Sequence, residues 1–549
     1  MKYNIVIGGA AGQGVKTLSK ALTKILKHHG FYTFTNTIYM SRIRGGHNYF
    51  QLRFSDQPIY THEKEADLIV ALNSETYSLH KTELKDTGFV LSDASLQLSN
   101  KNIINIDAVN YAKNMKIQKL SSQVYLGAIA KLFDLDKRIC EETLNDLQIE
   151  AFKMGYDSVN CIFNTVPTKQ DKTILINGNE AVALGAIASG MNFYSTYPMT
   201  PATSVMTYLA DKQADHGYIV EQAEDEIAAI NMATGASYAG ARTFIATSGG
   251  GFALMTEGLG MAAIAELPIV ILNVQRPGPA TGMPTKTSQS DLSFILHSSP
   301  DEYPRMIIAI TDAHSAFYQT FRAFNLADKY QMPVILLSDR YLADAATTIE
   351  PYDLTSLVIE KALSDENIKT FKRHEITESG ISPRLLPGNP NHTVMADSHE
   401  HDEDVNIIED SKTRIQMHDK RLRKLNTLQS ELIEPEFFGN KDADIVVIGW
   451  GSTKGLLREL ALDNELINKG VSALIFSDIF PLPQKKLLEL NKKNKHFISV
   501  EHNANGQFAK YIRSETGIYI EDQLLKYDGR QFDIKELKGK ILEVLNDWC

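Results

Sequence analysis

Short apolar runs rich in β-branched residues recur along nearly the whole chain, with longer helical patterns between them. Examples are NIVIGG at residues 4–9, TFIATSGG at residues 243–250 and ADIVVIGWG at residues 443–451. Each run is almost continuously apolar and ends in glycine or another turn-forming residue, which is typical of parallel strands buried on both faces. The sequence therefore predicts the α/β class, as a multidomain chain of parallel sheets covered by helices.

Polar and proline-containing stretches divide the chain into four predicted segments. At 549 residues the chain is long enough for about three domains, and we expect these at residues 1–170, 173–371 and 441–549. Between the second and third domains, at residues 372–440, the strand pattern stops and a linker is expected. The charged stretch KRLRKLNTLQSELIE in this linker predicts an exposed helix.

Charge and composition exclude several classes of protein. The net charge of -11 and the pI of about 5.8 argue against nucleic-acid binding as the main role, which usually needs a basic face. No run of ~18 apolar residues is present, so no membrane span is expected, and the N-terminus lacks a signal-peptide pattern. We therefore expect a cytoplasmic protein.

The three cysteines are Cys140, Cys161 and Cys549. They are widely separated and form no CxxC pair, so the sequence predicts neither a disulfide framework nor an iron-sulfur or other metal site on this chain. The histidines of HEHDED, His399 and His401, also lack the spacing of a structural zinc site. For this motif we expect an interdomain or subunit contact.

A glycine-rich turn, GGAAGQGV at residues 8–15, follows the first predicted strand and leads into a helix. Free backbone N–H groups at such a helix start suit a phosphate. Two named motifs do not fit: Val15 separates Gly14 from Lys16, which breaks the P-loop spacing, and Ala11 stands where the dinucleotide fingerprint needs its middle glycine. The glycines suit a phosphorylated ligand, and a purely structural turn is the alternative.

Four motifs in the second predicted domain follow strands or open helices, the places where open α/β sheets usually carry their sites. They are YPMTPAT, VEQAEDEIAAINMATGASYAG, ATSGGGFALMTEGLG and LNVQRPGPATGMPT. In the second motif we expect Glu221 and Glu224 in the first helical turn, where acids favour the helix dipole. Glu226 leads directly into an apolar helix, where burial would raise its pKa. A solvated first-turn acid is the alternative.

Arg276 lies between a predicted strand and the sequence PGP. A guanidinium held there by proline is a good candidate for a bidentate clamp on a carboxylate substrate. A structural salt bridge is the alternative.

Taken in order, the motifs GGAAGQGV with RIRGGHN, YPMTPAT, EDEIAAINMATGASYAGAR, TSGGGFALM, QRPGPATGMPT and EHNANGQFAKYIR resemble the alpha subunit of a 2-oxoacid:ferredoxin oxidoreductase with the gamma domain fused ahead of the alpha part. The resemblance covers nearly the whole chain. It implies a gamma domain at 1–170, a thiamin-diphosphate pyrimidine-binding domain at 173–371 and a transketolase C-terminal-like domain at 441–549.

The resemblance also implies roles for residues of the central domain. Glu226 matches the glutamate that hydrogen-bonds N1′ of the thiamin aminopyrimidine. Thr200 and Arg276 match positions that contact the 2-oxoacid, Thr200 also lying beside the cofactor, and Tyr197 is expected to line the same pocket. In the gamma domain, the resemblance implies coenzyme A contacts.

The expected coenzyme A contacts are Gly12, Gly14, Arg44 and Gly45. A purely architectural role for the gamma domain is the alternative.

The implied reaction is the oxidative decarboxylation of a 2-oxoacid with coenzyme A to acyl-CoA and carbon dioxide, with reduction of ferredoxin. The resemblance favours 2-oxoglutarate, with pyruvate and branched-chain 2-oxoacids as alternatives. Three scattered cysteines cannot hold a four-cysteine cluster, and the chain has no GDG segment to bind diphosphate through magnesium. A beta subunit is therefore expected to supply both the Mg site and the iron-sulfur cluster. A nucleotide-dependent dehydrogenase and a non-catalytic binding subunit are the alternatives of another class.

Overall fold

The computed structural model describes residues 1–41, 46–99, 102–142, 144–166 and 172–547. The chain forms two compact units. The first unit comprises Met1–Asn177, Asp344–Tyr352 and Phe532–Cys549, and the second comprises Gly178–Ala343 and Asp353–Gln531. The four sequence segments proposed above divide the chain differently, and they stay a prediction.

The first unit is built on an eight-stranded sheet of order β6-β5-β4-β1-β3-β2-β14-β7. The strands are β1 (Lys2–Ala10), β2 (Tyr32–Ile38), β3 (His47–Ser55), β4 (Ala66–Ala71), β5 (Leu84–Asp93), β6 (Ile103–Ile106), β7 (Ile174–Ile176) and β14 (Thr347–Ile349). Strands β1, β4, β5 and β6 run parallel, whereas β3 pairs antiparallel with β1 and β2. The sheet is mixed because only residues 39–46 connect β2 to β3, too few for the helical crossover that parallel neighbours need.

In the described part of the first unit, seven α-helices accompany this sheet. They are α1 (Val15–His28), α2 (Ser74–His80), α3 (Ala108–Asn114), α4 (Ser121–Leu132), α5 (Lys137–Glu141), α6 (Asp146–Asp157) and α20 (Ile534–Asp547). Helices α4 and α6 cross closely at Gly127 and Gly155, where an added Cβ on either would collide with the backbone of the other helix.

The second unit contains a seven-stranded sheet of order β18-β12-β13-β11-β10-β8-β9. Its strands are β8 (Phe193–Thr196), β9 (Ile219–Gln222), β10 (Thr243–Thr247), β11 (Ile269–Gln275), β12 (Met306–Ala309), β13 (Pro333–Asp339) and β18 (Asp478–Phe480). All neighbours pair parallel except β18, which joins the edge antiparallel to β12. The carboxyl ends of β8, β10 and β11 therefore lie at one edge of the sheet.

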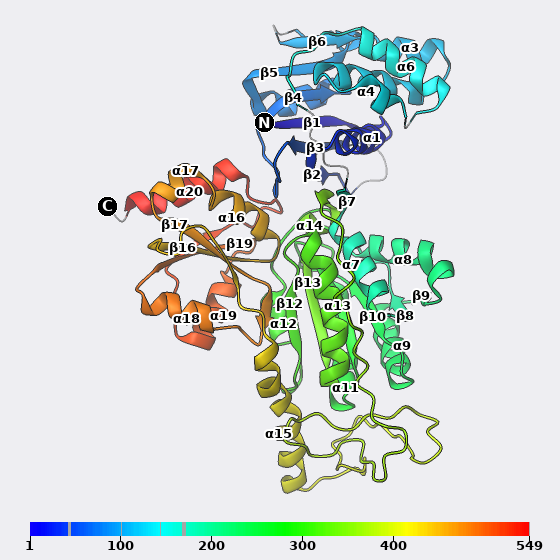
Figure 1. Ribbon diagram of the computed structural model, residues 1–549, viewed down its shortest axis with the longest axis vertical. Coiled ribbons are helices and arrows are strands. Elements are labelled where there is room, and N and C mark those ends of the chain that lie inside the picture. Colours follow the sequence, from blue (N-terminus) through cyan, green and yellow to red (C-terminus); the bar gives the residue numbers. More distant parts are fainter. Residues whose placement is uncertain (42–45, 100–101, 143, 167–171, 548–549) are drawn as a thin grey trace. The chain divides into compact units, whose positions relative to one another are not determined.

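Helices cover this sheet as the sequence pattern predicts, and α13 lies alongside α7 (Figure 1). The helices are α7 (Gly178–Ala188), α8 (Thr203–His216), α9 (Glu226–Tyr238), α10 (Gly249–Leu254), α11 (Thr256–Ile264), α12 (Leu292–Leu296), α13 (Ala313–Tyr330) and α14 (Arg340–Asp344).

A five-stranded sheet of order β15-β17-β16-β19-β20 completes the second unit. Its strands are β15 (Glu436–Phe438), β16 (Ile445–Trp450), β17 (Val471–Phe476), β19 (His496–Glu501) and β20 (Asp522–Leu525), with helices α16 (Lys454–Leu460), α17 (Asn464–Asn468), α18 (Lys485–Lys492) and α19 (Gln507–Thr516). One hydrophobic core includes Ile271 of the seven-stranded sheet and Leu474 of the five-stranded sheet. The predicted α/β class is confirmed in all three sheets.

Helix α15 (Ser411–Leu428) falls in the predicted linker, where an exposed helix was expected. That expectation is wrong for one face: Lys420 and Lys424 are 0% exposed. The reason is a buried carboxylate, Glu266, which lies 2.5 Å from each lysine Nζ and 2.9 Å from His374 Nδ1. Burial alone would raise the pKa of Glu266, but the two ammonium groups and the histidine hold it well below its ordinary value. We call Glu266, Lys420, Lys424 and His374 the Glu266 cluster.

The HEHDED motif at residues 399–404 lies against this helix. Glu400 accepts two hydrogen bonds from the Arg421 guanidinium, at 2.9 and 2.7 Å. The His401 ring is buried, with its centroid 4.1 Å from that of His374, while the exposed His399 bonds Asp397. The motif thus fastens its loop to α15 within the second unit.

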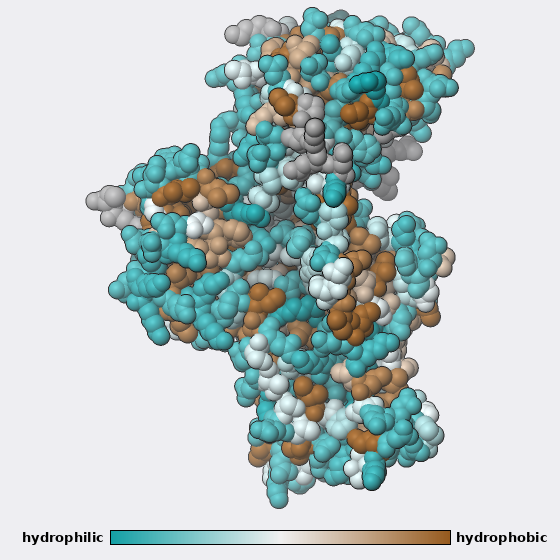
Figure 2. Space-filling model, in the orientation of Figure 1, coloured by the Kyte–Doolittle hydropathy of each residue, from teal (hydrophilic) through white to brown (hydrophobic). Residues whose placement is uncertain are grey.

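Among the residues that the structure describes, no helix is long and apolar enough to cross a bilayer. The face drawn in Figure 2 is mainly hydrophilic, with brown patches separated by teal groups.

Candidate active site

The YPMTPAT turn follows β8 at the carboxyl edge of the seven-stranded sheet and leads into α8. The fully buried Asn179 of α7 donates from Nδ2 to the Pro201 carbonyl at 2.9 Å, so the turn is anchored from below. Thr200 is half-buried and Tyr197 is 39% exposed. The turn is therefore held in place by Asn179, and the aromatic ring of Tyr197 on it is accessible to solvent.

Glu226 is the first residue of α9 and is only 3% exposed. Asp225 caps the helix, its carboxylate accepting from Ala228 N at 2.7 Å, and this leaves Glu226 turned into the protein. The other two acids are not in the first turn as expected: Glu221 lies in β9 and Glu224 precedes the cap, and both are exposed. Tertiary packing, rather than the local run of acids, selects the buried carboxyl.

The Glu226 carboxyl lacks a full set of partners. Its Oε1 is buried and makes no hydrogen bond to any described residue. Burial raises its pKa, with the Asp225 charge acting in the same direction and Arg276 against it. A buried acceptor without a donor is costly unless a ligand supplies one, so this atom fits a ligand with a ring nitrogen that can carry a proton.

The triple-glycine turn opens α10 directly beside this carboxyl. A Cβ at Gly251 would collide with Glu226 Oε1 and with Thr247 Oγ1, and a Cβ at Gly249 would lie 2.6 and 2.7 Å from the carboxylate oxygens of Asp291. Glycine is needed at both positions because two carboxyl groups lie against the backbone.

Arg276 extends from the end of β11, and its Nη1 donates to the backbone carbonyl of Thr200. Burial lowers the pKa of this guanidinium, and the charges of Asp291 and Glu226 oppose that effect. The structure thus brings Glu226, Thr200 and Arg276 to one edge of the sheet, as their places at strand ends predict.

Sequence reasoning gave no individual role to three contributors to this site. Asp291, Asn273 and Thr247 lie beside the predicted residues, yet an isolated Asp in SQSDLSF or an Asn inside an apolar strand gives no local signal. Gly251 was noticed only as part of a triple-glycine turn.

The first unit has a separate cavity at the N-terminus of α1. Its volume is about 990 Å³, and its lining includes Gly12 and Gly14, with φ of 93 and 88, together with Lys113, Lys116 and Lys119. Gly14 caps α1 without any side-chain hydrogen bond, and free backbone N–H groups at such a helix start suit an anion. The other two predicted residues here, Arg44 and Gly45, lie outside the described residues.

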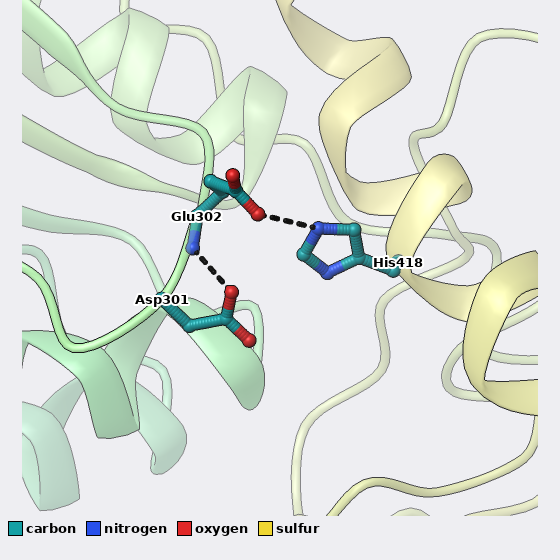
Figure 3. A group of neighbouring side chains, drawn as sticks. All are labelled: Asp301, Glu302 and His418. Carbon is teal, nitrogen blue, oxygen red and sulfur yellow. Dashed lines mark hydrogen bonds and ion pairs between the residues drawn. The ribbon is translucent and has the colours of Figure 1, made fainter.

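One group of side chains has the composition of a metal site (Figure 3). His418 of α15 points toward Glu302, with its Nε2 3.4 Å from the carboxylate, and Asp301 lies beside them. The Arg414 guanidinium already binds Asp301 Oδ2 at 2.7 Å and His418 Nδ1 at 2.8 Å. The group is therefore an ion-pair network that contains its own cation.

Comparison with known proteins identifies the family of this chain. Residues 184–420 match the model "Pyruvate flavodoxin/ferredoxin oxidoreductase, thiamine diP-bdg", and residues 4–156 match "Pyruvate ferredoxin/flavodoxin oxidoreductase". A 2-oxoacid:ferredoxin oxidoreductase subunit alpha from Sulfolobus sp is 32% identical over 100% of this chain and 98% of that protein. The chain belongs to the 2-oxoacid:ferredoxin oxidoreductases, as an alpha subunit. This membership confirms the predicted family and decides against a nucleotide-dependent dehydrogenase.

Two further relatives of this alpha subunit carry a substrate in their names. The 2-oxoglutarate synthase subunit KorA of Archaeoglobus fulgidus is 32% identical over 62% of this chain and 90% of its own length. The solved structure of 2-oxoglutarate:ferredoxin oxidoreductase from Magnetococcus marinus, with 2-oxoglutarate, coenzyme A and succinyl-CoA bound, covers 99% of both chains at 32% identity and a TM-score of 0.93.

Proposed function

We propose that this alpha subunit works in the cytoplasm with a beta subunit to decarboxylate 2-oxoglutarate oxidatively, forming an acyl-CoA and reducing ferredoxin. The names of the KorA and Magnetococcus marinus relatives support this substrate over pyruvate and branched-chain 2-oxoacids. The observation that carries the proposal is the buried Glu226 carboxyl, whose Oε1 has no hydrogen-bond partner among the described residues and lies against the triple-glycine turn.

Glu226 would hold thiamin diphosphate at N1′ of its aminopyrimidine ring. When bound, this cofactor supplies the electron sink for decarboxylation. Because burial raises the pKa of Glu226, its carboxyl holds a proton more readily than a free carboxyl does and can share it with a ring nitrogen. Because Gly251 has no side chain, the Glu226 carboxyl has room to lie against this turn. Thr200, on the YPMTPAT turn, would border the cofactor.

Arg276 and Thr200 would orient the substrate. The guanidinium is fixed at one Nη by the Thr200 carbonyl, and its remaining donors suit a carboxylate. The exposed ring of Tyr197, on the same turn, would border the substrate side chain.

Coenzyme A would bind at the cavity of the first unit. Gly12 and Gly14 offer backbone N–H groups, and Lys113, Lys116 and Lys119 offer positive charge, to the phosphates of the nucleotide. A cavity of about 990 Å³ is in the range of small-molecule sites.

A beta subunit would supply the Mg and diphosphate site and the iron-sulfur cluster that passes electrons to ferredoxin. The three cysteines of this chain are too few for a four-cysteine cluster, which supports a partner of this kind.

The test is Glu226→Gln in the complex co-purified with its partner, assayed with a panel of 2-oxoacids, coenzyme A and a viologen dye. Loss of the shared proton should lower kcat by about 10²–10⁴-fold, whereas the exposed neighbour Glu224→Gln should match wild type. Undiminished turnover by Glu226→Gln would refute the proton-sharing role. A complex that prefers pyruvate over 2-oxoglutarate would refute the substrate.

A further inference from the structure

The described lining of the first-unit cavity carries charge of one sign only. It contains Lys113, Lys116 and Lys119, and no aspartate or glutamate is among its described residues. Helix α1 also begins in this lining, where Gly14 provides no side-chain cap. Lysines and an uncapped helix start both attract anions, so the cavity suits a ligand with more than one phosphate group.

Gln123 does not fit a lining that only attracts anions. This residue of α4 lines the same cavity and is only 6% exposed. Its side-chain oxygen Oε1 is buried and accepts no hydrogen bond from any described residue. An unpaired buried acceptor is unfavourable, and it would repel a phosphate. A ligand that satisfies this atom must therefore bring a hydrogen-bond donor in addition to its negative charge.

The amino group of an adenine is the donor that matches the Gln123 side chain best. A glutamine amide presents one acceptor and one donor side by side, and adenine offers their complements at N6 and N7. Guanine has two acceptors at the corresponding edge, so it would leave Oε1 unpaired. Leu72, Val109 and Leu120 add apolar surface to the lining for a flat ring. A phosphorylated adenosine thus satisfies the lysines through its phosphates and Gln123 through its base.

We propose that Gln123 is a specificity-determining residue that recognises the adenine of coenzyme A. The inference rests on the proposed function, in which coenzyme A binds at this cavity. In coenzyme A, the ribose that carries the adenine also carries phosphate at two positions, whereas the amide N–H groups of the pantetheine arm lie beyond the diphosphate. Lys119 precedes Gln123 by only four residues, so a phosphate and the base of one nucleotide can reach both side chains.

The test compares coenzyme A with etheno-coenzyme A, whose adenine N6 is closed into an extra ring and carries no N–H. Both are titrated by calorimetry into the complex co-purified with its partner. Wild type should bind etheno-coenzyme A about tenfold more weakly than coenzyme A. Gln123→Leu should lose about tenfold in affinity for coenzyme A and none for etheno-coenzyme A, so that it binds the two ligands alike. In turnover, its KM for coenzyme A should rise about tenfold, while kcat and the KM for the 2-oxoacid stay unchanged.

Gln118→Leu is the matched control, because Gln118 lies in the same lining but is exposed. It should bind both ligands as wild type does. Unchanged affinity for coenzyme A in Gln123→Leu would overturn the inference, as would an equal loss of affinity for both ligands. If Gln123→Leu does not fold, as judged by thermal unfolding, Gln123→Met keeps a side chain of similar length and takes its place with the same expected results.

Lys116→Glu separates this inference from a failure of the proposed function. If Lys116→Glu and Gln123→Leu both leave the affinity for coenzyme A unchanged, coenzyme A binds elsewhere and its proposed placement is wrong. If only Lys116→Glu weakens binding, coenzyme A occupies the cavity and Gln123 does not recognise its base.

Discussion

Neutralising Glu266 should destabilise the second unit far more than removing an ordinary ion pair. In the Glu266 cluster, one carboxylate compensates two ammonium groups, and all three side chains are 0% exposed. In Glu266→Gln the shape is kept, but Lys420 and Lys424 remain buried without a counter-charge. The buried face of α15 would then have to open to water, or the two lysine side chains would have to lose their protons.

The magnitude follows from the burial. Breaking a buried pair by removing one partner costs about 3–5 kcal/mol, and two stranded lysines place Glu266→Gln at the upper end. At roughly 2 °C per kcal/mol for a large domain, the upper end of this range corresponds to a fall in Tm of about 10 °C. Lys424→Met should cost much less, because Glu266 then keeps Lys420 and His374 and only an excess charge is lost.

The assay is thermal unfolding by calorimetry, with Asp444→Asn as the control. Asp444 is 92% exposed and lies 3.2 Å from Lys495, so its loss should cost under about 1 kcal/mol. If Glu266→Gln melts within 2 °C of this control, the charge compensation does not hold α15 in place. If Lys424→Met is as damaging as Glu266→Gln, packing rather than charge is responsible.

Three further outcomes follow from the contacts described. Gly251→Ala should displace the Glu226 carboxyl and weaken thiamin diphosphate binding at least tenfold by calorimetry, whereas Gly250→Ala, whose Cβ would meet only a carbonyl oxygen at 3.9 Å, should bind normally. Lys116→Glu at the first-unit cavity should raise the KM for coenzyme A several-fold and leave that for the 2-oxoacid unchanged. Because the pKa of Glu266 is lowered in the fold, its contribution is present above pH 4.5 and lost below it, so the Tm difference between wild type and Glu266→Gln should shrink as melts are moved below pH 4.5.

Much of the fold could be predicted because buried strands show themselves as local runs of apolar residues. The runs at residues 4–9, 243–250 and 443–451 contain or overlap β1, β10 and β16, since a buried parallel strand is apolar throughout. The return of β14 to the first sheet could not be predicted, because a three-residue strand gains its place from β2 and β7 and not from its own sequence.

The residues of the candidate site also fall into those with a local sequence signal and those without one. Glu226 could be found because an acid opening an apolar helix is a local anomaly, and the structure places it in the interior. Asp291 and the Glu266 cluster could not, because their meaning depends on partners elsewhere in the chain: Lys420 is 154 residues from Glu266. In sequence, a lysine that balances a buried acid looks the same as one in water.

Three separate stretches of chain build the first unit, and this sets an order of events on the ribosome. Its sheet gains β14 only after nearly all of the seven-stranded sheet has been made, and α20, whose Lys535 pairs with Glu65, is made only after the last residue of the second unit. Domains usually fold as they emerge, N-terminal first. Here the first unit to start is the last to finish, so its unpaired edge at β2 must wait through most of translation for its partner strand.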